Sequence, residues 1–341
     1  MNAPAISPSS IKDSLRKSAD ALGIDAFGVA PVTAPPRREY FLQWISRLRH
    51  GTMRWLEQNS DKRLDPASLL PGARSIIVLG MNSYRPSPPA PYRIARHALG
   101  KDYHNLLFKR LKKLCALMRI YGGEQRPCVD TAPIMEKPLA ARAGLGWQGK
   151  NTLLIHREFG PWLLLGVILT TLELPPDTPA NDNCRNCTRC LDACPNGAIT
   201  APYQLDASRC LAYMSIEHQG SIPVEIRPAL GDRIFGCDTC LEVCPWNRYA
   251  RTARETAFPL SNSLFPAPLR DTLAWNEETY NAHFAGTPFK RLGLRRWLRN
   301  ACVVLGNIGT PADIPALQKM AEHPDPLLAE HAAWALGKFC A

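Results

Sequence analysis

The segment "CRNCTRCLDACPNGA" (residues 184–198) decides how the middle of this 341-residue chain folds. It places four cysteines within eleven residues, in the pattern C-x2-C-x2-C-x3-C-P. In bacterial two-cluster ferredoxins the first three thiolates of this pattern hold one [4Fe–4S] cluster, and the fourth crosses to the other. Short C-x2-C turns wrap three thiolates around one cluster, and the proline then directs the chain out of the loop. The segment therefore predicts an iron–sulfur module that carries electrons.

The second half of the module repeats only part of this pattern. The segment "GCDTCLEVCPWN" (residues 236–247) reads C-x2-C-x3-C-P, and Ile234 stands where its leading cysteine would be. Each cluster needs four thiolates, so the seven cysteines of the two motifs cannot supply two clusters, and the other cysteine inside the module is Cys210. We therefore assign Cys184, Cys187, Cys190 and Cys244 to one cluster, and Cys194, Cys210, Cys237 and Cys240 to the other.

Two other uses of clustered cysteines are disfavoured. Structural zinc uses closed groups of four Cys or His ligands and does not need two C-x3-C-P endings. Disulfides are rare in a reducing cytoplasm, and the N-terminal "MNAPAISPSSIK" lacks the apolar core of a secretory signal. The longest apolar run, "WLLLGVILTT" (residues 162–171), suits a buried strand and is too short for a membrane helix. We therefore expect a cytoplasmic protein that does not associate with membranes.

The rest of the chain predicts an α+β protein of three domains. Residues 1–175 alternate helical and strand patterns, including a strong buried strand at residues 75–84, and predict an α/β or α+β domain with one central sheet. Residues 176–250 form the ferredoxin-like domain. Residues 251–341 contain a linker and two similar apolar segments, "RNACVVLGNIG" (299–309) and "EHAAWALGKFC" (330–340). Their spacing of 31 residues predicts HEAT-like helical repeats.

Positive charge is concentrated in the first part of the chain. Residues 1–150 contain 24 Lys and Arg against 11 Asp and Glu, whereas residues 151–341 contain 17 against 19. A basic half indicates a polyanionic partner such as nucleic acid, although charge alone is equally consistent with a solvated surface. No nicotinamide site is indicated, because the glycines of "AGLGWQGKN" (143–151) do not have G-x-G-x-x-G spacing.

Several segments resemble the epoxyqueuosine reductase family. They are "DYH" (102–104), "VDTAP" (129–133), "RAGLGWQGKNTLLI" (142–155) and "RCLAYMSIEHQGSIPVEIRPALGDRIFGCDTCLEVCPWN" (209–247). The similarity runs in order over nearly the whole chain, with Ala95 and His97 standing where the family has Ser and Tyr. The resemblance implies that epoxyqueuosine at the wobble position of a tRNA anticodon is reduced to queuosine. It also implies cobalamin as a cofactor beside two [4Fe–4S] clusters.

The resemblance also implies roles for individual residues. Asp130 of "VDTAP" would donate the proton to the leaving oxygen, so we expect burial to raise its pKa. The implied cobalamin or substrate contacts are Arg93, Arg96, Asp102, Tyr103, His104, Asp130, Gly144, Gly146 and Lys150. The expected tRNA contacts are Glu217, His218, Lys290, Arg291, Arg295, Arg296 and Arg299. Each of these residues also has a purely structural interpretation, as a cap, a turn or a solvated helix face.

Two alternative functions remain open from the sequence. One is a cobalamin-dependent reductase of small molecules, similar to the reductive dehalogenases; the basic half and the helical C-terminus weigh against it. The other is a non-catalytic electron-transfer subunit, which would leave the first 175 residues without a role. We expect a monomer that receives its electrons from an external low-potential donor.

Overall fold

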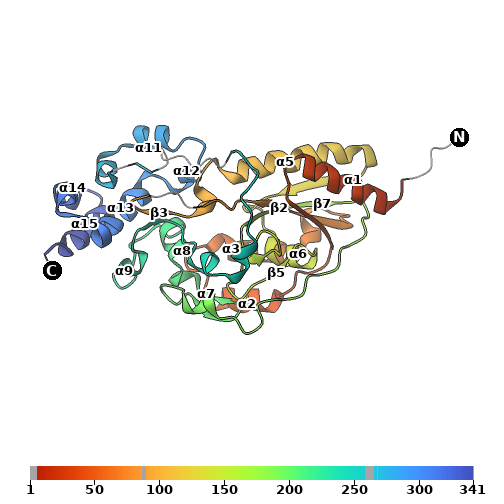
Figure 1. Cartoon of the computed structure of the whole chain (residues 1–341), viewed down its shortest axis with the longest axis horizontal. Helices are drawn as coiled ribbons and strands as arrows, with labels where there is room; N and C mark the ends of the chain where they lie inside the picture. The colour runs from red at the N-terminus through yellow and green to blue at the C-terminus, as the bar shows by residue number, and fades with distance from the viewer. Residues whose placement is uncertain (1–5, 87–89, 258–264, 267, 341) are drawn as a thin grey trace.

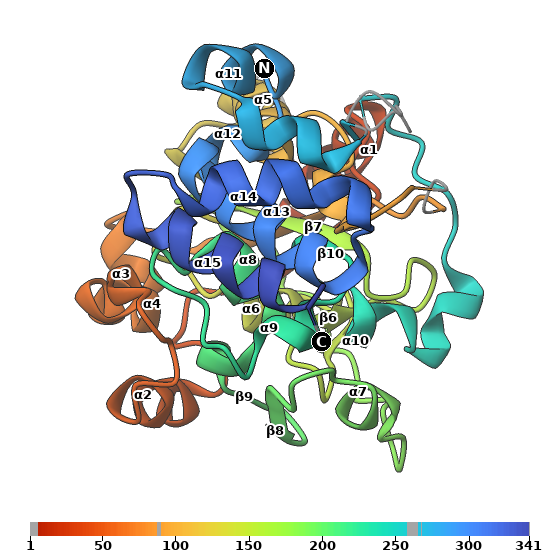
Figure 2. The ribbon, with the colours of Figure 1, turned by 90° about the vertical axis from the view of Figure 1, so that its left-hand side faces the viewer.

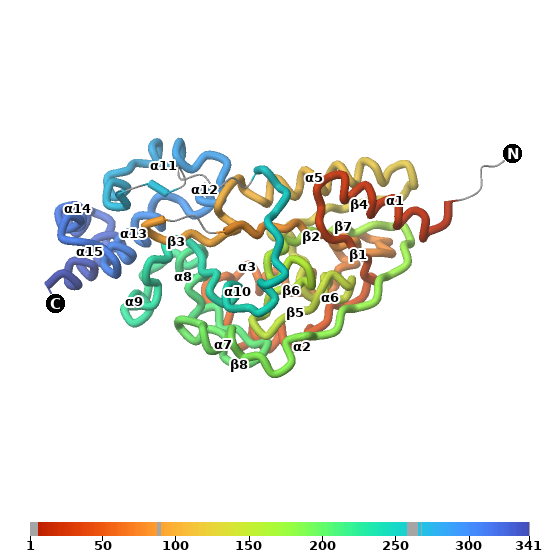
Figure 3. Tube along the Cα trace, in the orientation of Figure 1, coloured from red at the N-terminus to blue at the C-terminus, as the bar shows by residue number. Residues whose placement is uncertain are grey.

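The computed structural model describes residues 6–86, 90–257, 265–266 and 268–340 (Figure 1). Its strands are β1 (Ala26–Pro31), β2 (Ser75–Asn82), β3 (Arg93–Ile94), β4 (Gln125–Cys128), β5 (Trp147–Gln148), β6 (Leu154–Ile155), β7 (Leu163–Thr170), β8 (Ile199–Ala201), β9 (Gln204–Leu205) and β10 (Arg233–Phe235). Its helices are α1 (Pro8–Ala21), α2 (Arg38–Ser46), α3 (Arg54–Gln58), α4 (Ser60–Leu64), α5 (Tyr103–Met118), α6 (Glu136–Arg142), α7 (Arg189–Asp192), α8 (Leu211–Ile216), α9 (Arg227–Leu230), α10 (Thr239–Glu242), α11 (Glu277–His283), α12 (Phe289–Leu292), α13 (Leu294–Ile308), α14 (Ile314–Ala321) and α15 (Pro326–Gly337). The sheet and α1 lie at one end of the molecule, and α14 and α15 lie at the other (Figure 3).

The central sheet has four strands in the order β1-β2-β7-β4, and every neighbouring pair is antiparallel. The predicted buried strands are confirmed as β2 and β7, which form the middle of the sheet. Of the two classes expected for this part, α/β is corrected, because that class has a mostly parallel sheet; the antiparallel pairing makes this part α+β.

Helices cover both faces of the sheet. Side chains on one face, such as Ile77 of β2, pack in a core with Leu111 of α5 and with α1. Side chains on the other face, such as Val78, pack in a second core with Leu139 of α6. Because both faces are covered, β2 is buried along its whole length. This explains why its sequence is a continuous apolar run rather than an alternating one.

The iron–sulfur segment uses one local structure twice. Each of α7 and α10 is a single turn that contains one cysteine, Cys190 or Cys240, and ends before a Cys-Pro pair. Proline cannot continue a helix, so the chain leaves the loop there. Strand β10, just before the second of these loops, pairs in parallel with β3 from the N-terminal part.

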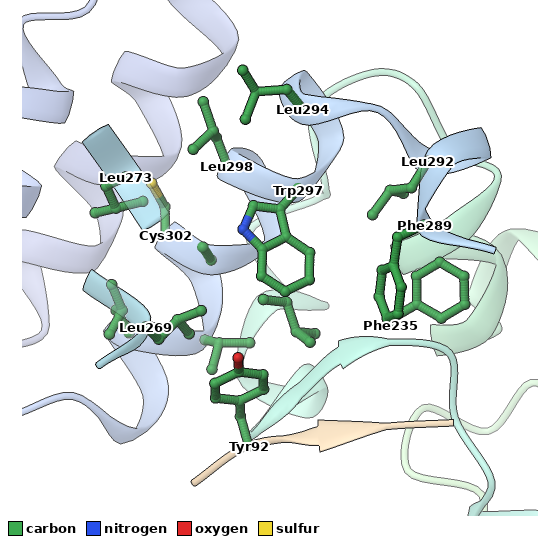
Figure 4. Packing of buried hydrophobic residues seen from close by; sticks show 14 of the residues in the cluster. Tyr92, Phe235, Leu269, Leu273, Phe289, Leu292, Leu294, Trp297, Leu298 and Cys302 are labelled. Atoms are coloured by element: carbon green, nitrogen blue, oxygen red, sulfur yellow. The ribbon is translucent and has the colours of Figure 1, made fainter. Parts of the chain in front are cut away.

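The predicted C-terminal helices are present as α13, α14 and α15, which pack against one another (Figure 2). Their classification as HEAT-like repeats stays a prediction. The core around Trp297 of α13 also contains Tyr92 from the N-terminal part and Phe235 from the iron–sulfur segment (Figure 4). All three predicted domains therefore contribute to one core, and their predicted boundaries do not separate independent packing units. Among the described residues, no helix is long and apolar enough to cross a membrane.

Replacing Trp297 should strongly destabilise the protein. The side chain is fully buried, and its Nε1–H donates to Oγ1 of Thr272 at 3.0 Å. We expect Trp297→Ala to lower the free energy of unfolding by about 3–5 kcal/mol, the usual range for a buried Trp, in urea titrations followed by circular dichroism. The matched control is Ile308→Ala at the end of the same helix, where the side chain is 43% exposed. Equal losses in the two variants would contradict this account of the core.

Candidate active site and iron–sulfur centres

A cleft of about 560 Å³ lies where the N-terminal part, the iron–sulfur segment and the C-terminal helices meet. Its walls come from α3, α4, the start of α5, the loop after β4, the end of α8 and the segment from α12 to α13. The charged groups that line it are Arg63, His104, Asp130, Glu217, Arg291 and Arg296.

The imidazole of His104 lies between two carboxylates. Its Nδ1 is 2.6 Å from Oδ1 of Asp102, and its Nε2 is 2.8 Å from Oδ2 of Asp130. Asp102 is the N-cap of α5, and the same Oδ1 accepts a hydrogen bond from the backbone N–H of His104 at 3.0 Å. Aspartate is favoured at this position because it satisfies a free N–H of the first helical turn. The second oxygen of Asp102 accepts a hydrogen bond from Nε of Arg291 at 3.2 Å. The helix cap therefore fixes the orientation of the His104 imidazole.

Asp130 follows β4 and reaches the cleft from the strand end. Its φ of 45° lies in the left-handed region, which Asp tolerates better than most residues. The backbone N–H of Asp130 donates to Oε1 of Glu136 at the start of α6, at 2.8 Å. This hydrogen bond holds the loop in the conformation that presents the carboxylate to His104.

The prediction that burial raises the pKa of Asp130 is wrong in its outcome. Burial does act in that direction, but the hydrogen bond and positive charge of His104 outweigh it and lower the pKa of Asp130. Burial alone would lower the pKa of His104, yet its hydrogen bonds to Asp102 and Asp130 raise this pKa to about 9. At neutral pH the proton is therefore on the imidazole, and the two neighbouring carboxylates are ionised.

A second cavity of about 300 Å³ adjoins the cleft and shares His97, Tyr103 and Asp130 with it. Ser83 and the side chains at the start of β7 form one wall. Asp238 and Leu241 form another, and these residues are the sequence neighbours of Cys237 and Cys240. The iron–sulfur loop therefore borders the space that leads to Asp130.

The thiols gather into the two groups that the sequence assigns. Cys184, Cys187, Cys190 and Cys244 line one hollow of about 460 Å³. Burial raises the pKa of the Cys190 thiol to about 11, and the other three thiols of its group raise it further in the same direction. In the second group, burial and the thiols of Cys210, Cys237 and Cys194 raise the pKa of Cys240. A bound cation stabilises the thiolate form of a cysteine. Thiols that do not ionise on their own can therefore do so once iron is bound.

The structure shows no compact site for an isolated ion. Within the described part of the chain, no group of three or more His, Cys, Asp or Glu side chains is arranged to hold a metal ion. The thiols surround a hollow instead, and Lys150 supports its rim. The Nζ of Lys150 donates to the backbone oxygens of Arg185 at 2.6 Å and Cys187 at 3.0 Å.

The expected cobalamin or substrate contacts divide into two sets. Tyr103, His104 and Asp130 line the cleft, and Asp102 lies directly behind His104. The others do not line either cavity: Arg93 and Arg96 form ion pairs with the acidic residues Asp232 and Glu242, Lys150 lies at the first thiol group, and Gly144 and Gly146 pack on backbone. A Cβ atom at Gly146 would lie 2.1 Å from the backbone oxygen of Ile155, which explains the glycine without a ligand.

The expected tRNA-contacting residues are also placed differently from one another. Lys290, Arg291 and Arg295 are exposed, whereas Arg296 is half-buried and lines the cleft together with Glu217. His218 is half-buried, with Nε2 2.8 Å from the backbone oxygen of Ser221. Arg299 is fully buried, and its guanidinium donates to the backbone oxygens of Met214, His218 and Gly220. The interpretation of Arg299 as part of an exposed phosphate-binding stripe is therefore corrected, because no phosphate can reach it.

Several lining residues were not identified as site residues from the sequence, among them Trp55, Arg63, His97 and Glu136. Trp55, Arg63 and His97 are common surface or core residue types in segments without a motif. Glu136 does have a local signal, since it lies six residues after Asp130 at the start of a helix.

Comparison with known proteins identifies the class of the chain. Residues 183–247 match the family described as a 4Fe-4S double cluster binding domain, and residues 63–131 match the family described as epoxyqueuosine reductase QueG. The chain is an oxidoreductase that contains a 4Fe-4S cluster-binding domain.

The relatives identify the family. The chain is 40% identical over 336 residues to the epoxyqueuosine reductase of Xanthomonas campestris, covering 95% of each chain. It is 39% identical over 329 residues to that of Escherichia coli, covering 93% of this chain and 86% of the other. A crystal structure of an epoxyqueuosine reductase with an epoxyqueuosine-modified stem loop of tRNA-Tyr is 29% identical, with a TM-score of 0.90 over 96% of this chain and 90% of the other. The chain belongs to the epoxyqueuosine reductase family.

Single cysteine replacements should remove one cluster at a time. We expect Cys190→Ala and Cys240→Ala each to lose about half of the iron and sulfide bound by the reconstituted wild-type protein, because each belongs to a different group of four ligands. The control is Cys340→Ala, an exposed cysteine outside both groups. Anaerobic iron and sulfide analysis measures the effect. Full iron content in either of the first two variants would contradict the assignment.

Proposed function

We propose that this chain reduces the epoxide of epoxyqueuosine in a tRNA anticodon to the alkene of queuosine. The observation that carries the proposal is the hydrogen-bonded row Asp102–His104–Asp130, which opens into a cleft near the iron–sulfur loop. Conversion of an epoxide to an alkene consumes two electrons and two protons and releases the oxygen as water. Such a reaction needs a proton donor and an electron source at one place, and the cleft brings candidates for both together.

The proposed proton donor is the His104–Asp130 pair acting as a unit. At neutral pH the pair holds one proton on Nε2 of His104, hydrogen-bonded to Oδ2 of Asp130. When the leaving oxygen gains negative charge, this proton can move to Asp130 and from there to the oxygen, while Asp102 stabilises the imidazole. The second proton that the reaction consumes would come from solvent. General acids in such positions typically accelerate a reaction about 10²–10⁴-fold. In this proposal Asp130 is not protonated before the reaction begins. It is a carboxylate that receives its proton from the imidazolium of His104.

Cobalamin is the proposed cofactor, in the space between Tyr103 and the iron–sulfur loop. The lining of the cavity there suits one face of a large ring, because its walls combine the aromatic ring of Trp162 with the apolar side chains of Leu163 and Leu165, and Ser83 adds a polar group. When bound, cobalamin would supply a strongly reducing cobalt centre. Tyr103 and His97 would bound it on the side that faces the substrate cleft.

Two [4Fe–4S] clusters are proposed as the route for electrons, with an external low-potential donor as their source. The group around Cys240 is proposed to be adjacent to the cofactor, because Asp238 and Leu241 line that cavity. The group around Cys190 lines a different, open hollow with Arg248 at its rim, and would receive electrons first. Iron–sulfur clusters span reduction potentials from about −700 to +450 mV, and the lower part of this range suits low-potential chemistry.

The proposed substrate is consistent with the charge of the chain. The excess of Lys and Arg in residues 1–150, and the exposed Lys290, Arg291 and Arg295, would contact RNA phosphates. Such contacts make affinity depend on salt concentration. Sequence-specific RNA recognition usually targets unpaired bases that can be splayed out, and a wobble base in an anticodon loop can enter the cleft in that way.

The deciding experiment is anaerobic conversion of tRNA bearing epoxyqueuosine by protein reconstituted with iron, sulfide and cobalamin. Nucleoside analysis by mass spectrometry should show queuosine, and electron paramagnetic resonance should show reducible clusters and bound cobalamin. Clusters without bound cobalamin and without conversion would support an electron-transfer subunit. Reduction of small halogenated compounds without conversion of the tRNA would support the dehalogenase-like alternative.

Replacing Asp130 should remove turnover while leaving the cofactors in place. Asn has nearly the same shape but cannot pass a proton to the substrate, so we expect Asp130→Asn to lower kcat by about 100-fold or more. Iron, sulfide and cobalamin contents should equal those of the wild-type protein. The matched control is Asp271→Asn, an acidic residue outside the cleft whose side chain is 67% exposed. Near-normal kcat in Asp130→Asn would remove Asp130 from the proposed role.

A further inference from the structure

One large aromatic side chain in the cleft wall remains unexplained by the proposed chemistry. Trp55 of α3 lines the cleft and is 44% exposed. Its ring therefore leaves a large apolar surface in contact with water, which is unfavourable. The neighbouring helix α4 contributes Arg63, whose guanidinium carbon lies 5.1 Å from the centre of the Trp55 ring. Asn59, between the two helices, donates from Nδ2 to the backbone oxygen of Trp55 at 3.4 Å. We call Trp55, Asn59 and Arg63 the α3–α4 shelf.

Arg63 has hydrogen-bonding capacity that the fold does not use. Its side chain is 6% exposed and lines the cleft, and its Nη1 donates to the backbone oxygen of Ile134 at 3.5 Å. Its buried Nε has no hydrogen-bond partner among the residues that the structure describes. An unpaired buried N–H is costly. Because Arg63 also lines the cleft, an oxygen of a bound group can approach its guanidinium there, so the shelf can hold a ligand.

The position of the shelf indicates which part of the substrate it would meet. Ile134 belongs to the loop after Asp130, so Arg63 is hydrogen-bonded to the loop that carries the proposed proton donor. Trp55 is the exposed member of the shelf, and Arg63 is the buried one. A nucleotide whose base reaches Asp130 must leave the stack of its own loop, and its neighbours then lose a stacking partner. An exposed indole backed by a guanidinium gives such a neighbour a new surface, because bases stack on aromatic rings in single-stranded RNA complexes.

We propose that the α3–α4 shelf binds an unpaired nucleobase next to the nucleotide that reacts, with Trp55 stacking on the base and Arg63 donating to an oxygen of the RNA. This inference rests on the proposed function and adds a positioning site to it. Arg63 fixes the ring from one side, so the stacking surface is already oriented before RNA binds. The shelf would therefore determine how the anticodon loop enters the cleft, without touching the epoxide.

The test uses the complete reconstituted protein and a labelled anticodon stem-loop RNA, with affinity measured by fluorescence anisotropy at fixed salt. Trp55→Ala should weaken binding about tenfold, which is within the contribution of one base–aromatic stack, and Trp55→Phe should recover most of it. Tyr249→Ala is the matched control. Tyr249 is 43% exposed and the guanidinium carbon of Arg248 lies 4.7 Å from the centre of its ring, but Tyr249 does not line the cleft. Equal iron contents and circular dichroism spectra establish that the variants fold.

A second RNA identifies the stacked base. When the base on one side of the wobble position is removed to leave an abasic site, the wild-type protein should lose about as much affinity as Trp55→Ala, and Trp55→Ala should lose no more. The proposal is overturned if Trp55→Ala binds the RNA as tightly as the wild-type protein does. It is also overturned if abasic sites on the two sides of the wobble position weaken binding to Trp55→Ala further and by equal amounts. If the wild-type protein converts epoxyqueuosine in either case, the proposed function stands and the shelf alone fails. A wild-type protein that does not bind the stem-loop contradicts both.

Discussion

The placement of one charged imidazole between two carboxylates is the constraint on which the active-site cleft depends. His104 can hold its proton at neutral pH because Asp102 and Asp130 contact its two nitrogens. Each carboxylate is fixed by a different element: Asp102 caps α5, and Asp130 lies in the loop after β4. Arg291 then ties the C-terminal helices to the same row through Asp102. The sheet, helix α5 and the C-terminal segment therefore have to assemble together before His104 can hold its proton between the two carboxylates.

The surroundings limit the negative charge of this row. Glu136 holds the backbone of Asp130, and burial together with the charge of Asp130 raises the pKa of Glu136 to about 8. Glu136 is therefore largely neutral at pH 7, so it fixes the loop without adding a third carboxylate charge. Arg63 and Arg291 supply positive charge on the same cleft. A leaving oxygen would meet one mobile proton in a cleft whose lining carries more positive than negative groups.

The sequence predicts the parts of this structure that depend on short-range patterns. Cysteine spacing gives the two thiol groups because the ferredoxin pattern fixes which thiolate crosses to the other cluster, and continuous apolar runs give β2 and β7. Long-range partners have no such signal. Arg291 meets Asp102 across 189 positions of the chain, and His104 reverses the expected direction of the pKa shift of Asp130. Arg299 resembles its exposed neighbours in sequence but donates to the carbonyl oxygens of a separate segment. Charge alone therefore predicts an exposed position for a side chain that is buried. The order of the sheet is likewise set by packing and not by the strand patterns themselves.

The most direct measurement of this account is the titration of His104 by nitrogen-15 NMR, with the resonance assigned by its loss in His104→Gln. The imidazole should carry both protons through neutral pH and lose one as the pH rises through about 9. In Asp102→Asn the midpoint should move down, because one stabilising carboxylate is gone. A midpoint near the ordinary value of about 6.5, unchanged in Asp102→Asn, would contradict the claim that this row stores the proton.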